Sequence, residues 1–223
     1  MYKSKYNKKL NKFKDIHKGK SAILFATGPT IKDYEPFEGS EKCIKVGLNR
    51  IYNYKKLLSD LDYFFFGSHY YVDEKHRNNI DSVCENNEFI KLSASYENGT
   101  LTGRGNINPE DSLKLGAIPF ENNLSDFSND ISKYAMLGHS IVFPAIQFIL
   151  YTGVSTIYLI FYCIYLVGCD GGYTIGSVQS NDEHLLHWWS KFNEFKENYY
   201  NDVRIISINP ISLKGRFEDA IVE

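Results

Sequence analysis

The sequence predicts an α/β protein with a Rossmann-like, mostly parallel sheet that is flanked by helices. Three observations lead to this fold class. Short apolar runs recur along the chain, small or polar residues follow each run, and the connections between runs are long enough to cross over a sheet. Hairpins would need much shorter connections. We therefore expect parallel strands that are buried on both faces.

Five apolar runs are the expected strands. The first three are separated by residues 31–42 and 51–62, which would form crossover connections on the faces of the sheet. The expected strands are 21–26 (SAILFA), 43–48 (CIKVGL), 63–66 (YFFF), 88–92 (EFIKL) and 203–208 (VRIISI).

A further strand is expected in the charge-free stretch from Tyr134 to Cys169. Its length is compatible with a membrane span, but Pro144, Gln147 and Gly153 interrupt its apolar character. We interpret it as a buried helix over 140–152 followed by a buried strand. Ser140 would cap the helix and Gly153 would end it. The strand region repeats Ile-Tyr-Leu after seven residues, at 157–159 and 164–166, and we favour the second copy as the strand because it leads directly into Gly168-Cys169-Asp170.

Residues 2–17 place Tyr2, Tyr6, Leu10, Phe13 and His17 at spacings of three and four, which predicts an amphipathic helix with a lysine-rich outer face. Two interpretations remain open. The helix packs against the domain with its lysines in solvent, or it meets an anionic membrane or an acidic partner.

The remaining segments are less regular. Residues 93–133 are rich in Asn, Gly, Ser and Asp without a steady period, so we expect an irregular lid-like insert with short helices. Residues 183–200 carry aromatic side chains at helical spacing and predict a helix, and 212–222 predict a short closing helix.

Charge and cysteine content narrow the function classes. The chain has 223 residues and a net charge of −2, which does not suit a nucleic-acid binder. The first 20 residues hold eight lysines and one aspartate, a local charge of +7 that leaves −9 for the rest. The four cysteines show no metal-binding spacing, and the start MYKSKYNKKL lacks the apolar core of a secretory signal. We therefore expect a cytoplasmic protein with reduced thiols and no metal site.

Ligands of open parallel sheets bind beyond the carboxyl ends of the strands. Polar or small residues follow the expected strands there: Thr27, Gly28, Pro29 and Thr30 after the first, Asn49 after the second, Ser68 after the third and Asp170 after the charge-free stretch. The turn at Gly28 matches neither the P-loop nor the dinucleotide-binding pattern, so a plain tight turn is an equal alternative.

Two other groups are candidates for chemistry. Gly138, His139 and Ser140 precede the expected helix, and helix N-termini suit phosphate groups, although an ordinary cap is an equal alternative. His184 and His187 share one helix face, and either could serve as a general base, although histidines on a helix more often have no such role. Trp188 and Trp189 are expected to pack in the core rather than to stack on a ligand.

Three blocks of sequence resemble one bacterial and archaeal family. The segment ILFATGPTIKD resembles its opening glycine-rich turn, VGLNRIY resembles the end of its second strand, and GHSIVFPAIQFILYTGVSTIYL with the later IYLVGCDGGY resembles its central block. This family, the 6-hydroxymethylpterin diphosphokinase-like proteins, includes motility-associated and surface-polysaccharide glycosyltransferases. The layout is also similar to that of bacterial lipooligosaccharide sialyltransferases. The chain departs from the family pattern at Thr27 and Thr30, and it carries the seven-residue repeat just before Asp170.

The resemblance implies a role for each candidate. Thr27, Gly28, Pro29 and Thr30 would contact the nucleotide, with Ser68 nearby, and Asn49 would bind its ribose or phosphate. Gly138, His139 and Ser140 would hold the cytidine or its phosphate, Tyr173 would steady the leaving phosphate beside Asp170, and His184 or His187 would be the general base.

The expected domain is therefore a nucleotide-binding one over 21–223, preceded by a basic helix over 1–20. The expected function is transfer of a sugar, such as a nonulosonic acid from a CMP-activated donor, to a cell-surface glycan in polysaccharide biosynthesis, without metal or cofactor. Residues 93–133 would recognise the acceptor, residues 1–20 would touch the inner membrane face, and the chain could form homo-oligomers. One alternative is an ATP-dependent pterin pyrophosphokinase that uses Mg²⁺, and another is a non-catalytic glycan-assembly or partner-binding protein.

Overall fold

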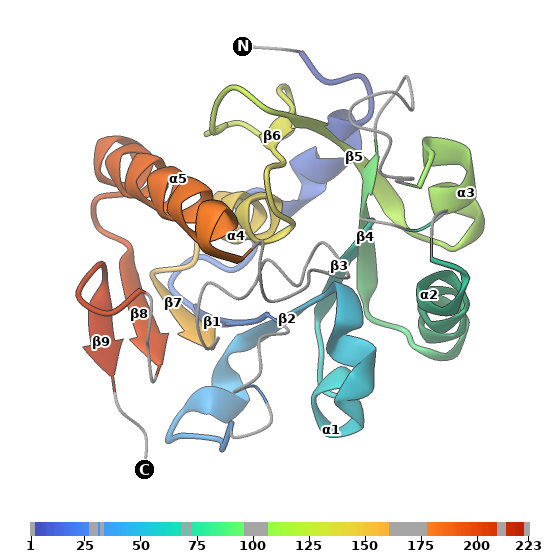
Figure 1. Cartoon of the computed structure of the whole chain (residues 1–223), viewed down its shortest axis with the longest axis horizontal. Coiled ribbons are helices and arrows are strands. Elements are labelled where there is room, and N and C mark those ends of the chain that lie inside the picture. The colour runs from blue at the N-terminus through green and yellow to red at the C-terminus, as the bar shows by residue number, and fades with distance from the viewer. Residues whose placement is uncertain are drawn as a thin grey trace.

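The computed structural model describes residues 3–26, 31, 34–67, 70, 73–95, 107–160, 178–208 and 213–220, with only the backbone of 160 and 178–185. These residues form a nine-stranded sheet in which every neighbouring pair of strands is parallel, in the order β6-β5-β4-β3-β2-β1-β7-β8-β9 (Figure 1). The strands are β1 (Ser21–Phe25), β2 (Ile44–Leu48), β3 (Tyr63–Phe66), β4 (Ile90–Ser95), β5 (Ile118–Asn123), β6 (Met136–Leu137), β7 (Thr156–Ile160), β8 (Arg204–Ile208) and β9 (Glu218–Ala220).

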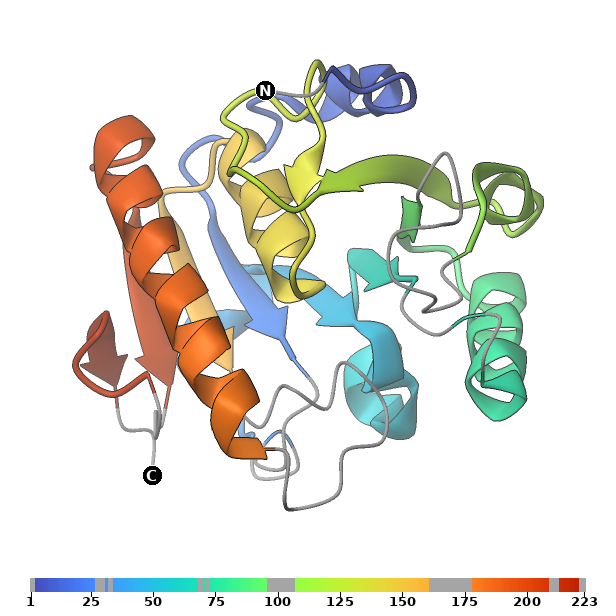
Figure 2. The same ribbon diagram turned by 45° about the horizontal axis from the view of Figure 1, so that its top comes forward.

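Helices cover both faces of this sheet, so the α/β Rossmann-like class is confirmed. On one face, α4 and α5 lie side by side in front of β1, β7 and β8, and the 3₁₀ helix η1 packs beside α4 (Figure 2). On the other face lie α1, α2 and α3 with the 3₁₀ helices η3 and η4 (Figure 1). The bounds are α1 (Lys55–Leu58), α2 (Glu74–Asn86), α3 (Pro109–Lys114), α4 (Val142–Tyr151), α5 (Val178–Tyr199), η1 (Asn7–Phe13), η3 (Ser40–Lys42) and η4 (Asn49–Asn53).

The apolar runs became central strands because both of their faces are covered. In β3 all four residues are buried, with Tyr63 and Phe65 in the core under α4, and Phe64 and Phe66 in the core under α2. This alternation is the period of two that a pleated strand imposes. The strands expected at 21–26, 43–48, 63–66, 88–92 and 203–208 are all present with small shifts of their ends.

The order of the strands reverses direction once, between β1 and β7. From β1 the chain adds β2 to β6 on one side, and α4 then returns it to β7 on the other side of β1. Phe25 at the end of β1 is paired with Ile160 at the end of β7. Doubly wound sheets bind their ligands at such a switch point.

The strand after α4 is the first copy of the repeated Ile-Tyr-Leu, so the preference for the second copy was wrong. Residues Thr156–Ile160 pair with both β1 and β8, and the second copy lies outside the described residues. The turn between α4 and β7 explains this choice. Gly153 ends the helix with φ +86, and its carbonyl accepts a hydrogen bond from the Gly19 N–H (3.2 Å), while the Ser155 N–H donates to the Lys20 carbonyl (2.9 Å). These bonds start β7 directly beside β1.

The N-terminal segment differs from the expected helix over 2–17. It forms η1 and then turns, because side chains from the sheet bind its backbone. The buried Glu121 carboxylate accepts hydrogen bonds from the Lys5 N–H (2.9 Å) and the Tyr6 N–H (3.3 Å). The Asn7 amide donates to the Tyr134 carbonyl (3.0 Å) and accepts from the Glu121 N–H (2.7 Å). Leu10 is buried in the core, so this segment packs against the sheet.

Two further expectations are corrected. The stretch 93–133 holds the end of β4, the short helix α3 and the strand β5, which lies inside the sheet between β4 and β6, while 96–106 lie outside the described residues. The closing helix expected at 212–222 is absent from the described part, 213–220, which forms a turn and the edge strand β9. Within the described ranges, no helix has the length and apolarity needed to cross a membrane.

Candidate functional site

The carboxyl edge of the sheet at the β1/β7 switch point is the candidate site. All strands point to this edge because they are parallel, and the first residues of α4 and α5 lie there as well (Figure 2). The structure describes the side chains of five predicted site residues: Asn49, Gly138, His139, Ser140 and His187. Thr27, Gly28, Pro29, Thr30, Ser68, Asp170 and Tyr173 lie outside the described residues, and of His184 only its place in α5 is described.

Asn49 is the most informative of these residues. It directly follows β2, and its backbone is left-handed, with φ +37, which asparagine tolerates better than most residues. Its side chain is 2% exposed, and neither its Nδ2 nor its Oδ1 has a hydrogen-bond partner among the described residues. Buried polar groups are nearly always paired, so an unpaired amide at a ligand-binding edge indicates a missing partner. The neighbouring strand supports this location, because Phe25 at the end of β1 pairs with Gly47, two residues before Asn49.

A small polar cluster fixes the turn that carries Asn49. The Tyr52 hydroxyl is 2.9 Å from Nδ1 of the buried His76, which joins η4 to α2. Arg50 lies 3.8 Å from Asp73, the N-cap residue of α2. The Asp73 carboxylate accepts a hydrogen bond from the His76 N–H (3.0 Å), and this bond is the main reason that its pKa is lowered. Asn49 is therefore held on a rigid support.

Gly138, His139 and Ser140 connect β6 to α4. A Cβ atom on Gly138 would lie 2.5 Å from Cγ of Asn122, so the close approach of β5 demands glycine here. Ser140 does not cap the helix as predicted, because α4 begins one residue later, with Ile141 at the N-cap and no side-chain cap. The backbone carbonyl of Ser140 accepts from the Phe143 N–H (3.0 Å), while its buried hydroxyl has no partner in the described part of the chain.

Gln147 of α4 holds this connection in place, a role that its position on an apolar helix did not reveal. Its side chain is 1% exposed. Its Oε1 accepts from the Ser128 N–H (2.8 Å) and the Leu137 N–H (3.3 Å), and its Nε2 donates to the carbonyls of Leu137 (3.3 Å) and Phe143 (2.9 Å). One amide thus ties the loop after β5, the strand β6 and the helix α4 together.

Trp188 brings the two described candidate histidines into one cluster. The His139 ring is stacked on the Trp188 ring, with centroids 3.9 Å apart and planes 23° apart. The His187 ring contacts the same indole edge-to-face at 5.6 Å. His139 Nε2 lies 2.9 Å from the Leu124 carbonyl, which fixes its ring. The tryptophans pack as expected: Trp189 is buried in the core, and Trp188 is half-buried and packs against the core as well as on His139.

The cluster of His139, Trp188 and His187 can therefore present an imidazole beside the start of α4 and the buried Ser140 hydroxyl. Within the described residues, no three His, Cys, Asp or Glu side chains converge as metal ligands.

Comparisons with protein-family models, with curated proteins and with solved structures gave no match to this chain. The resemblance described under the sequence analysis therefore stays a prediction.

Proposed function

We propose that the protein is a glycosyltransferase that moves a sugar from a nucleotide-activated donor to a cell-surface glycan. The donor proposed is a CMP-linked nonulosonic acid. Support comes from the doubly wound sheet, from the polar groups at its switch point and from the sequence resemblance to glycosyltransferases.

The unpaired amide of Asn49 carries the proposal. Dinucleotide-binding sheets place an acidic residue about 20 positions after the first glycine of their turn, where it binds a ribose hydroxyl. Asn49 follows Gly28 by a similar interval and also ends the second strand. An amide offers both a donor and an acceptor, and a ribose hydroxyl needs both. A bound nucleotide would therefore satisfy the two atoms that have no partner among the described residues.

The phosphate of the nucleotide is proposed to lie at the start of α4. Free N–H groups and a partial positive charge at a helix start favour an anion. The Ser140 hydroxyl has no partner among the described residues and can donate to a phosphate oxygen. Gly138 brings the chain close to β5, and the stacked His139 closes one side.

In the proposed reaction, an acceptor hydroxyl oxygen bonds to the anomeric carbon of the donor sugar. The bond from that carbon to the phosphate oxygen breaks, and the nucleotide leaves with the electron pair. A histidine, His187 or His184, takes the proton of the acceptor hydroxyl. Tyr173 and Asp170 are proposed to stabilise the leaving phosphate, with Thr27, Gly28, Pro29, Thr30 and Ser68 at the nucleotide. In this proposal, side chains and backbone N–H groups stabilise the charge that develops on the leaving phosphate, so the reaction requires no metal.

A nucleotide-binding panel tests this proposal. Melting temperature is measured with CMP, CDP, UDP, GDP and ATP, each with and without Mg²⁺. Stabilisation by CMP without Mg²⁺ is expected, because a ligand that binds only the native state raises its stability. A response only to ATP with Mg²⁺ would contradict the proposal and favour the pyrophosphokinase. Indifference to every nucleotide would favour a non-catalytic partner-binding role.

We also propose a cytoplasmic protein that touches the inner membrane face through residues 1–20. The lysines of the described part of this segment are all exposed, and Ile16 is 47% exposed among them. Each lysine near an anionic surface contributes about 1 kcal/mol. Sedimentation with vesicles that contain anionic lipid should therefore occur at low salt and fail for Lys8→Glu/Lys9→Glu. Equal sedimentation of that variant would contradict the membrane contact.

A further inference from the structure

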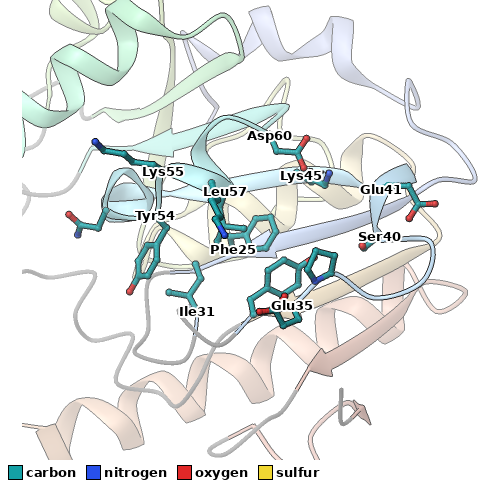
Figure 3. A pocket seen from close by; sticks show the side chains of 14 residues that line it. Phe25, Ile31, Glu35, Ser40, Glu41, Lys45, Tyr54, Lys55, Leu57 and Asp60 are labelled. Carbon is teal, nitrogen blue, oxygen red and sulfur yellow. Dashed lines mark hydrogen bonds and ion pairs between the residues drawn. The ribbon is translucent and has the colours of Figure 1, made fainter. Parts of the chain in front are cut away.

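A pocket of about 730 Å³ lies on the face of the sheet opposite α4 and α5. Its volume falls in the range of small-molecule sites. Figure 3 shows Phe25, Ile31 and Leu57 in its middle, Tyr54 at one end, and the Lys45–Asp60 ion pair toward the other. Among the described residues, none of those predicted for the nucleotide site lines it.

The pocket exists because the connections over β1 and β2 are poor in helix. In the described part of the β1–β2 connection, Ile31 and the three-residue η3 are in 3₁₀ conformation, and the next connection holds η4 with five residues and α1 with four. Neither lays a full helix across these strands. On the same face, Lys45 pairs with Ile23 and Gly47 pairs with Phe25, so β2 contributes one long polar side chain and one position without a side chain. The pocket therefore lies above these strands, with Phe25, which is 1% exposed, buried at its base.

The apolar part of the pocket combines aromatic and aliphatic side chains. The Tyr34 ring meets Phe25 edge-to-face at 5.1 Å, and burial raises the pKa of the Tyr34 hydroxyl. Ile31 is 2% exposed and lies beneath this surface. The apolar surface that a ligand can reach comes from half-buried side chains, those of Tyr34, Tyr54 and Leu57, and it matches the C–H face of a ring rather than a charged group.

The rim has balanced charge and mixed hydrogen-bonding groups. The Lys45 side chain is 13% exposed and its amine is paired with the Asp60 carboxylate, so neither acts as a lone charge. Carboxylates accept hydrogen bonds and amines donate them, and a hydroxyl can satisfy both kinds because it donates and accepts. The charged residues that line the pocket are three bases and three acids, so their net charge is zero and they do not favour a ligand of either charge sign. They are Lys45, Lys55, Lys56, Glu35, Glu41 and Asp60.

We propose that this pocket binds a neutral oligosaccharide, whose apolar ring face lies over the middle of the pocket and whose hydroxyl groups meet the rim. Phe25 ends β1, so the pocket adjoins the carboxyl edge that carries Asn49. This places the glycan acceptor over the β1–β2 connection instead of residues 93–133. The role as acceptor rests on the proposed function, whereas binding of the saccharide does not.

The experiment measures binding of maltotriose, cellotriose and chitotriose to the full chain without nucleotide, by saturation-transfer NMR and calorimetry. At least one should bind saturably. Tyr54→Ala should weaken it about tenfold and Tyr54→Phe less than about threefold, since the ring remains. Glu35→Leu, a change at an exposed rim position that leaves the core untouched, should weaken it about threefold through the lost acceptor. The control Tyr199→Ala removes a tyrosine that is 59% exposed on α5, and it should change nothing.

Several results would overturn the inference. The first is that no trisaccharide binds at about 20 mM, a concentration that would reveal even millimolar affinity. The second is that both Tyr54→Ala and Glu35→Leu leave the affinity unchanged. The third is that trigalacturonate or decanoate binds more tightly than any neutral trisaccharide. The nucleotide site is tested separately, because Asn49→Gly should leave trisaccharide binding intact. Saccharide binding without any CMP binding would support the saccharide pocket and contradict the proposed transferase function.

Discussion

At the scale of single residues, Asn49 combines two features that each cost free energy. A non-glycine residue with positive φ and a buried amide without partners among the described residues each cost about 1–3 kcal/mol. Nothing in its packing requires either feature, because a glycine would adopt the same backbone. Costs of this kind are typical of positions kept for a ligand.

Gly138→Ala tests the close approach between β6 and β5. The added Cβ would lie 2.5 Å from Cγ and 2.6 Å from Cβ of Asn122, so one of the strands must shift. We expect a loss of about 1–3 kcal/mol in the free energy of unfolding, measured by urea denaturation.

The double variant Gly138→Ala/Asn122→Gly provides the control. Removing the Asn122 side chain removes the clash, so the Gly138→Ala substitution should cost much less in the Asn122→Gly background. An equal cost in both backgrounds would show that glycine is needed at this position for another reason.

The candidate residues show what a sequence can predict at this scale. Asn49 could be chosen because it follows an apolar strand, and Gly138 because it precedes a helix. The cap assigned to Ser140 failed because helix ends shift by one residue. The stack of Trp188 on His139 joins positions 49 apart in sequence, and no local pattern encodes it.

At the scale of elements, α4 organises the edge through one buried amide. Every residue of α4 is buried, and Gln147 is its polar exception, with four hydrogen bonds to the loop after β5, to β6 and to its own first turn. The helix therefore fixes the position of the residues that precede it, including His139.

Gln147→Leu should lower the free energy of unfolding by about 3 kcal/mol, because it leaves the buried N–H groups of Ser128 and Leu137 without acceptors. Asn86→Leu is the matched control. Asn86 also donates to a carbonyl one helical turn earlier, that of Ser82, but on an exposed surface, so the change should stay within about 0.5 kcal/mol. Similar losses in the two variants would contradict the role of Gln147.

The strands that the sequence predicted have an apolar composition, whereas the elements that it missed do not. β1 and β3 are apolar on both faces and β2 is apolar apart from Lys45, so their composition alone marks them. β5 has Glu121, Asn122 and Asn123 in its second half, and it is a strand because of its neighbours and the bonds that Glu121 makes to the N-terminal segment. η1 replaces an amphipathic α-helix for the same reason, since long-range hydrogen bonds override local periodicity.

At the scale of the whole molecule, the N-terminal segment is fastened to the sheet at both of its ends. Glu121 and Asn7 hold its start, and His17 holds its end through a 2.7 Å hydrogen bond between Nε2 and the Tyr63 hydroxyl of β3. Burial is the main cause that lowers the pKa of His17, the charge of Lys20 adds to it, and Asp62 opposes it. Burial also raises the pKa of Tyr63 to about 12, so its hydroxyl stays protonated.

Stability should therefore fall as the pH drops below about 6.5, the pKa of histidine in an unfolded chain. In that window the unfolded chain binds a proton at His17 and the native protein does not, so the free energy of unfolding increases with pH until about 6.5. Urea denaturation at several pH values between 5 and 8 measures the slope. His17→Gln should reduce it, and an unchanged slope in that variant would assign the effect to other groups.

The affinity of CMP for the wild type and for Asn49→Gly, measured by calorimetry together with urea denaturation of both proteins, tests the central claim most directly. If the amide is kept for a nucleotide, the glycine variant binds CMP at least about tenfold more weakly. Its free energy of unfolding stays equal or rises, because both the strain and the unpaired buried amide are gone. Equal CMP affinity combined with lower stability would show that Asn49 supports the fold and would contradict the account.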